Sequence, residues 1–198
     1  MIMKLKYIKL FENFKELVIN NKSKNDMFGP VKSPNKIKNI ISKYIKKYNC
    51  NNFIDIGSGK GDIVRYVDSL GLRSEGIEID NTLKKYNTDL NIHFKSAYNH
   101  DYSKYDIIYL YRPMESKDKM DKLFEKISSD IKSNTIIIYL FPHFFEEFFP
   151  NYFYALRSFK EETDSKLIQI VSKFNLNIIK TGQFNTGDLI DEYIILKK

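Results

Sequence analysis

The spacing of apolar residues predicts two amphipathic helices in the N-terminal quarter of the chain. Residues 1–24 show the i, i+3, i+4, i+7 spacing of a helix face, and we expect them to form a basic amphipathic arm. A second helix is predicted from Ser33 to Tyr48, with Ser33 as its N-cap and Pro34 in its first turn. One face of this helix would carry Ile37, Ile40, Ile41, Tyr44 and Ile45.

After Asn52 the chain alternates between short apolar runs and helical patterns. Strands are predicted at 53–56, 74–79, 92–95, 106–111 and 135–141, and helices at 62–70, 117–131 and 161–174. This alternation is typical of a doubly wound α/β fold with a mainly parallel sheet. Two further runs, 176–183 and 189–196, flank the turn sequence Asn185-Thr186-Gly187-Asp188 and predict a C-terminal antiparallel hairpin. Residues 25–198 should therefore form one α/β domain.

Composition and length fit one globular domain. The 198 residues are 42% hydrophobic and 29% charged, and no apolar run approaches the ~20 residues that span a bilayer. The start Met-Ile-Met-Lys-Leu-Lys is too polar for a secretory signal, so we expect a cytoplasmic protein without membrane contact. Cys50 is the single cysteine, and His93, His100 and His143 lack metal-ligand spacing, so neither an intrachain disulfide nor a bound metal is predicted.

The positive charge is concentrated at the N-terminal end. Residues 1–50 carry 12 lysines and 3 acidic residues, a net charge of +9, whereas the other residues bring the total down to +7. Such a segment can bind nucleic acid, an acidic protein or a phosphorylated acceptor, or it can be a solvated basic face without a specific partner.

A glycine-rich turn follows the first predicted strand. The segment Asp55-Ile56-Gly57-Ser58-Gly59-Lys60-Gly61 lies between a buried strand and a helix start, and its glycines allow positive φ and close approach of a ligand to the backbone. A dinucleotide-binding turn has glycine at the sixth position, where this chain has Asp62, whose carboxylate would repel a pyrophosphate. A phosphate-binding P-loop is excluded because Lys60 is followed by Gly61. The alternative is a tight turn without a ligand.

The next predicted strand supplies an acidic residue. Glu78 stands 21 residues after Gly57, close to the end of that strand. A carboxylate at this place can accept two hydrogen bonds from adjacent ribose hydroxyls. The glycine turn and Glu78 together therefore predict a ligand that contains a ribose.

At these residues the sequence resembles the class I methyltransferases, which use S-adenosylmethionine as cofactor. The resemblance spans roughly residues 28–198 and implies a Rossmann-like, doubly wound, mainly parallel seven-stranded sheet with a C-terminal antiparallel hairpin, preceded by N-terminal helices. It implies that Glu78 binds the ribose of S-adenosylmethionine, and Asp62 is compatible with the zwitterionic methionine end. By the same resemblance, the methionine portion would be held by Asp55, Gly57, Ser58, Gly59, Lys60 and Gly61.

The resemblance also assigns Ser96 and Ala97, after the third predicted strand, to the adenine. Ser96 stands where the family commonly has Asp, and its hydroxyl would accept a hydrogen bond more weakly than a carboxylate does. Asn99 or Asp101 could take that role instead, or the segment could be an ordinary loop.

The fourth predicted strand ends in Tyr111-Arg112-Pro113-Met114, where many relatives face the transferred methyl group. Tyr111 and Arg112 are therefore the candidate catalytic residues. Enzymes that methylate the amines of nucleic-acid bases carry Asp or Asn before Pro-Pro-aromatic here, so this chemistry is disfavoured. The planar guanidinium of Arg112 could orient an acidic acceptor, or it could pair with a neighbouring acid or carbonyl.

An aromatic segment at 141–154, in which 8 of 14 residues are aromatic, would either wall the acceptor pocket or form a helix that packs by its aromatic residues. His143, Glu146 and Glu147 are candidate bases in it. The favoured function is methyl transfer to a protein side chain or a small molecule. RNA methylation that uses the basic N-terminal segment, or a non-catalytic scaffold that keeps the cofactor-binding fold, are the alternatives.

Overall fold

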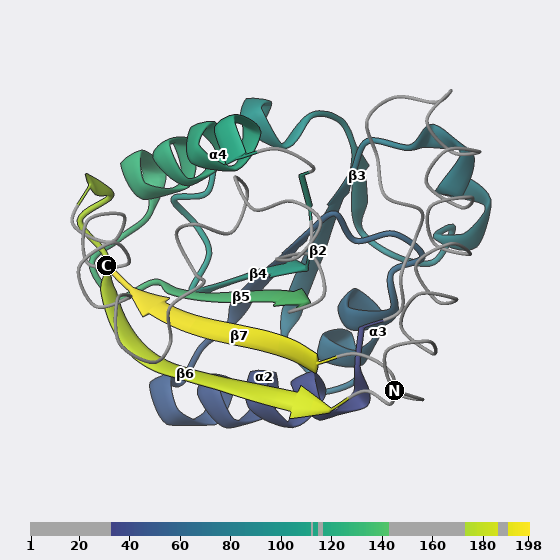
Figure 1. Cartoon of the computed structure of the whole chain (residues 1–198). Helices are drawn as coiled ribbons and strands as arrows, with labels where there is room; N and C mark the ends of the chain where they lie inside the picture. Colours follow the sequence, from purple (N-terminus) through teal and green to yellow (C-terminus); the bar gives the residue numbers. More distant parts are fainter. Residues whose placement is uncertain (1–32, 112, 115–116, 143–172, 186–189) are drawn as a thin grey trace, which may run out of the picture.

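The computed structural model describes residues 33–111, 113–114, 117–142, 173–185 and 190–198. In this part of the chain, seven strands form one sheet in the order β3-β2-β1-β4-β5-β7-β6 (Figure 1). The strands are β1 (Asn52–Ile56), β2 (Arg73–Glu78), β3 (Ile92–Phe94), β4 (Ile107–Tyr111), β5 (Ile136–Pro142), β6 (Asn177–Asn185) and β7 (Ile190–Lys197). The α-helices are α2 (Asn35–Tyr48), α3 (Asp62–Asp68) and α4 (Lys117–Asp130), and the 3₁₀ helices are η1 (Asn81–Tyr86) and η2 (Ala97–Asn99).

Strand pairing agrees with the predicted doubly wound sheet. β1 pairs in parallel with both β2 and β4, β2 pairs with β3, and β4 pairs with β5. β7 lies antiparallel between β5 and β6, so the predicted C-terminal hairpin is confirmed. The order of strand addition reverses at β1, which creates a switch point between β1 and β4.

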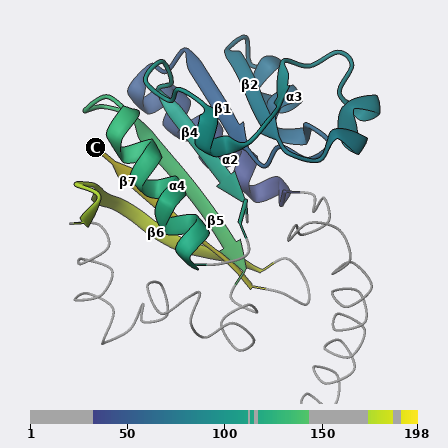
Figure 2. The same cartoon turned by 90° about the horizontal axis from the view of Figure 1, so that it is seen from above.

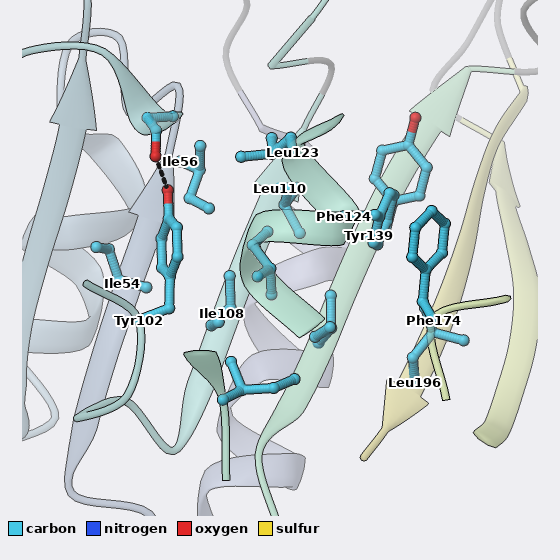
Figure 3. Close-up of a cluster of buried hydrophobic side chains, with 14 of the residues drawn as sticks. Ile54, Ile56, Tyr102, Ile108, Leu110, Leu123, Phe124, Tyr139, Phe174 and Leu196 are labelled. Carbon is cyan, nitrogen blue, oxygen red and sulfur yellow. Dashed lines mark hydrogen bonds between the residues drawn. The ribbon is translucent and has the colours of Figure 1, made fainter. Parts of the chain in front are cut away.

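Helices cover both faces of the sheet, so the central strands are apolar on both sides (Figure 2). On one face, Ile108 and Leu110 of β4 pack with residues of α4 and with Tyr102 (Figure 3). On the other face, Ile107 and Tyr109 pack against α2 and α3. Within the described ranges, no helix is both long enough and apolar enough to cross a membrane.

The predicted element positions agree with the structure to within one or two residues, but the predicted start of the first described helix is wrong. Ser33 was predicted to cap α2, whereas Pro34 is the N-cap residue and no side-chain hydrogen bond caps the helix. The Ser33 hydroxyl instead forms a 3.0 Å hydrogen bond with the Tyr109 hydroxyl. The Ser33 hydroxyl therefore bonds a residue of β4 that is distant in the sequence, and does not cap the helix.

The connections around β3 are short. η1 joins β2 to β3 and η2 follows β3, and the sequence predicted neither 3₁₀ helix. Residues 1–24, the aromatic stretch from His143 onward, the turn at 186–189 and most of the helix predicted at 161–174 lie outside the described residues.

A buried carboxylate on β2 fixes the segment that leads from β3 to β4. Glu75 accepts hydrogen bonds from His93 Nε2 (2.8 Å), Lys104 Nζ (2.9 Å) and the Tyr105 hydroxyl (2.8 Å). Because Tyr105 donates to Glu75, the 2.8 Å contact between His100 Nε2 and the Tyr105 oxygen requires His100 to donate. Burial lowers the pKa of His100 to about 4, so its ring is neutral near pH 7. The network thus ties both ends of the segment to β2.

This network predicts a loss of stability in acid. Burial alone raises the pKa of Glu75, but the hydrogen bonds from His93, Lys104 and Tyr105 outweigh burial and bring it from 4.5 to about 2. Since the folded pKa is depressed, the network contributes on the order of 3 kcal/mol above pH 4.5, and this contribution is lost as the pH falls from 4.5 toward 2.

Glu75→Gln keeps the shape of the side chain and removes its charge. In urea unfolding, the variant should be less stable than the wild type above pH 4.5, and the difference should shrink as the pH approaches 2. A stability difference that is independent of pH over this range would show that the charge of Glu75 does not stabilise the fold.

Candidate functional site

The predicted site residues are brought together at one edge of the sheet. Ile56 is in register with Ile77 of β2 and Leu110 of β4, and Glu78 is in register with Phe94 of β3. Because these strands are parallel, their carboxyl ends meet at the same edge. The glycine loop, Glu78, the segment that contains Ser96 and Ala97, and the end of β4 therefore lie at this edge, on both sides of the switch point.

The glycine loop has the backbone that its sequence predicted. Gly57, Gly59 and Gly61 have φ values of 78°, 54° and 74°, a region that favours glycine. The backbone N–H groups of Gly57 and Ser58 donate to the Ile77 carbonyl at 2.8 and 3.0 Å. The loop is thus fastened to the end of β2 at its start.

Neighbouring residues leave no room for a side chain at Gly61, and Gly57 lies against Pro113. A Cβ on Gly61 would lie 2.3 Å from Leu90 Cδ1 and 2.9 Å from Asn87 Oδ1. A Cβ on Gly57 would lie 3.4 Å from Pro113, the residue that follows the end of β4 closely. The loop is therefore packed from both sides of the switch point.

Two predicted loop residues direct their side chains away from the loop backbone. Ser58 is buried, and its hydroxyl donates to the Ile77 carbonyl at 3.4 Å. The Lys60 ammonium lies over the Tyr86 ring, 4.8 Å from its centroid. The Ser58 hydroxyl is thus used within the fold, and the Lys60 ammonium packs on η1.

Glu78 is buried and holds the loop. Its Oε2 accepts a 2.8 Å hydrogen bond from Gly59 N–H, and its Oε1 accepts from Ile79 and Asp80 N–H at 2.8 and 2.9 Å. A carboxylate has about four acceptor positions, so three are used by the backbone and one position on Oε2 is left for a ligand hydroxyl. Glu78 therefore shapes the site as well as offering an acceptor to it.

Asp55, in β1 next to the glycines of the loop, is a buried carboxylate. Burial is the largest cause that raises its pKa well above the ordinary value, and the negative charges of Glu78 and Asp62 raise it further. No side chain in the described ranges forms a salt bridge or hydrogen bond with the Asp55 carboxylate. A cation bound at this edge would stabilise the ionised form of Asp55.

Ser96 and Ala97 lie at the start of η2, in a segment held by side chains. Ser96 is the N-cap of η2, and its hydroxyl accepts a 3.3 Å hydrogen bond from Tyr98 N–H. The buried Tyr102 hydroxyl donates to the Ala97 carbonyl at 2.7 Å, the bond drawn in Figure 3. Burial raises the pKa of Tyr102, so it stays a donor. The segment is thus fixed at two successive residues.

The end of β4 contacts the same region. Tyr98 donates to the Lys119 carbonyl at 3.0 Å and lies 3.6 Å from the Met114 sulfur, which connects η2 to α4 and to the segment after β4. Tyr111 is half-buried and packs on the core under α2. Arg112, His143, Glu146 and Glu147 lie outside the described residues. The catalytic assignment of Tyr111 and Arg112 therefore stays a prediction.

Asn87 and Tyr98 are site residues that the sequence did not predict. Asn87 bonds the Gly59 carbonyl from 28 residues away, and no motif marks it. Tyr98 adjoins the predicted Ser96-Ala97 pair, so its position next to that pair was the one signal for it. Among the described residues, no group of three His, Cys, Asp or Glu side chains is arranged to hold a metal ion.

No protein-family model matches the sequence, and no curated protein matches it either. Solved structures do match. An S-adenosylmethionine-dependent methyltransferase from Clostridium acetobutylicum is similar with a TM-score of 0.62 and 9% identity, over 96% of this chain and 98% of that one. A SAM-dependent methyltransferase from Archaeoglobus fulgidus is similar with a TM-score of 0.60 and 16% identity, over 84% and 95%.

Magnesium protoporphyrin IX methyltransferase from Synechocystis, solved with bound SAH, is also similar, with a TM-score of 0.59 and 10% identity over 94% of both chains. These likenesses extend over most of this chain. The chain therefore has the Rossmann-like fold of the class I S-adenosylmethionine-dependent methyltransferases.

Proposed function

We propose that this chain binds S-adenosylmethionine and transfers its methyl group. The observation that carries the proposal is the glycine loop at the switch point: its tip is hydrogen-bonded to the buried Glu78, and the buried Asp55 precedes its glycines in β1. The similar structures of S-adenosylmethionine-dependent methyltransferases, one of which contains SAH, support it.

The charges at the loop favour this cofactor over a dinucleotide. The negative charges of Glu78 and Asp62 act on Asp55, which burial isolates from water. A pyrophosphate would add negative charge to this group, whereas S-adenosylmethionine brings an ammonium and a sulfonium. We propose that Asp55 attracts the ammonium of the methionine portion and that the free position of Glu78 accepts a ribose hydroxyl.

Methyl transfer requires the protein mainly to align the acceptor with the methyl group of the cofactor. S-adenosylmethionine supplies an activated methyl group with a neutral leaving group. The chain would hold the adenine beside Ser96 and Ala97, and would orient the acceptor from the end of β4, where Tyr111 and Arg112 are the proposed catalytic residues. Methyl transfer to a small molecule or a protein side chain is the acceptor class we propose, and magnesium protoporphyrin IX methyltransferase is a small-molecule example on the same fold.

Calorimetric titration with S-adenosylmethionine tests binding, and transfer of labelled methyl to fractionated cell extract tests activity and the acceptor class. Gly61→Ala should weaken binding by at least about tenfold, because its Cβ would meet Leu90 and Asn87 in addition to the strain of positive φ. Gly71→Ala is the matched control, since Gly71 has a φ of 82° but nothing within 4 Å of the added Cβ.

A folded wild-type chain that does not bind S-adenosylmethionine would contradict the proposal. Binding without labelled product in any fraction would favour the non-catalytic scaffold.

The buried carboxylate predicts a pH dependence of cofactor affinity. Protonation of Asp55 removes its attraction for the ammonium, so affinity should rise with pH through the raised pKa of Asp55 and level off above it. Asp55→Asn should weaken binding by about tenfold and abolish this pH dependence. An Asp55→Asn variant with wild-type affinity at every pH would exclude the proposed contact.

RNA is a second candidate acceptor, favoured by the surface of α2. The helix carries five lysines and no acidic residue, and none of these lysines forms a salt bridge within the described residues. The positive charges of Lys46 and Lys47, in the last turn, interact favourably with the helix dipole, whereas the charge of Lys36, in the first turn, interacts unfavourably with it. Ser33, just before α2, bonds Tyr109 of β4, so the helix begins near the site and runs away from it. The basic face could thus guide a polyanion toward the site.

Charge reversal on α2 tests this second candidate. The double variant Lys43→Glu with Lys46→Glu should weaken binding of a mixed-sequence single-stranded RNA and lower the slope of log affinity against log salt by about 1.4, because two phosphate contacts are lost. Lys122→Glu with Lys132→Glu, exposed lysines in and after α4, is the charge-matched control and should change binding much less. Equal effects of both pairs would indicate a nonspecific charge effect and contradict docking on α2.

A further inference from the structure

Gly59, at the tip of the glycine loop, is held by two side chains from the β2–β3 connection. Its N–H donates to Glu78 Oε2 at 2.8 Å, and its carbonyl accepts from Asn87 Nδ2 at 2.9 Å. Glycine has no side chain to anchor and a wide choice of backbone conformations. The shape of the tip therefore depends on these two contacts.

Asn87 is placed to act on the loop as a whole. The residue is 4% exposed and follows η1, and its second amide proton is bonded to the Leu83 carbonyl at 3.2 Å. Its Oδ1 lies beside Gly61, since a Cβ added there would be 2.9 Å from it. One buried amide thus lies against two of the three glycines in the loop.

The acceptor of Asn87 shows that packing alone does not account for this residue. Within the described part of the chain, Asn87 Oδ1 is buried without a hydrogen-bond partner. An unpaired buried acceptor destabilises the folded state, and an apolar residue of similar size, such as Leu, would avoid it. The hydrogen bonds of the Asn87 side chain are those that its amide N–H groups donate to the Gly59 and Leu83 carbonyls.

The two contacts on Gly59 differ in what a ligand does to them. A ribose hydroxyl at Glu78 Oε2 would share or compete for the atom that holds Gly59 N–H. The bond from Asn87 to the Gly59 carbonyl involves no atom of Glu78 and can persist. On the basis of the proposed cofactor site, we infer that Asn87 is a positioning residue that keeps the loop in its ligand-binding shape when a ribose hydroxyl shares Glu78 Oε2 with the Gly59 N–H.

Measuring the affinity for two ligands distinguishes a positioning role of Asn87 from a general effect on stability. S-adenosylhomocysteine contains the amino-acid portion that the loop would hold, whereas 5′-methylthioadenosine lacks it. Asn87→Leu and the isosteric Asn87→Asp should each raise the Kd for S-adenosylhomocysteine by about three- to tenfold, because the hydrogen bond to the Gly59 carbonyl is lost, and leave the Kd for methylthioadenosine within about twofold. Two variants are used so that one suffices if the other does not fold.

Ser74→Ala is the matched control. Ser74 is buried on the same strand as Glu78, and its hydroxyl contacts the Val64 carbonyl at 2.9 Å and Asp68 Oδ1 at 2.6 Å, away from the loop. This variant should lower the melting temperature without changing either Kd. Equal losses for both ligands in the Asn87 variants, or an unchanged Kd for S-adenosylhomocysteine, would overturn the inference. A wild-type chain that binds neither ligand would instead overturn the proposed function.

Hydrogen exchange in the wild-type protein gives an independent measurement. The side-chain amide protons of Asn87 should be protected in the free protein and remain protected with S-adenosylhomocysteine bound, while the Gly59 amide resonance shifts. Loss of Asn87 protection on binding would show that its contact with the loop is released, and the inference would be wrong.

Discussion

The parallel pairing of β1 with both β2 and β4 is the constraint on which the site depends. Because strands are added in opposite directions from β1, the connections on its two sides diverge beyond the carboxyl ends. The loop after β1 has to turn within this space, against Ile77 on one side and Pro113 on the other. Bare backbone with positive φ meets that requirement, which is why glycines occupy the turn.

Buried polar side chains hold the connections around this turn. Glu78 and Asn87 bond the glycine loop, Tyr102 bonds the Ala97 carbonyl, and Glu75 holds the segment before β4. Hydrogen bonds of this kind are strong where water is excluded, and they are costly to leave half made. They keep the short connection between β2 and β3, which contains only the 3₁₀ helix η1, in a defined position.

Charge is distributed unequally between the site and the outer surface. The acidic residues Asp55 and Glu78 are buried at the carboxyl edge, where burial and mutual repulsion raise the pKa of Asp55. The outer face of α2 is basic. Such an arrangement suits a cofactor with positive charge inside and a partner with negative charge outside, so the proposed cofactor and the RNA alternative are compatible with each other.

The sequence by itself determined the features that depend on local spacing. Apolar runs such as residues 106–111 identified strands, the glycines at 57, 59 and 61 identified the turn, and Glu78 was predicted from its distance along the chain. These features are local because strand periodicity and positive φ are properties of a few consecutive residues.

Only the tertiary structure decided which polar side chains meet. Ser33 was predicted to cap a helix, but its hydroxyl bonds Tyr109, 76 residues away. Asn87 donates to the carbonyl of Gly59, which is 28 residues away in the sequence. The partners of Glu75 likewise come from β3 and from the segment before β4. A single polar residue carries no periodic signal, and its free energy is set by the donor or acceptor that the fold brings to it in a dry interior.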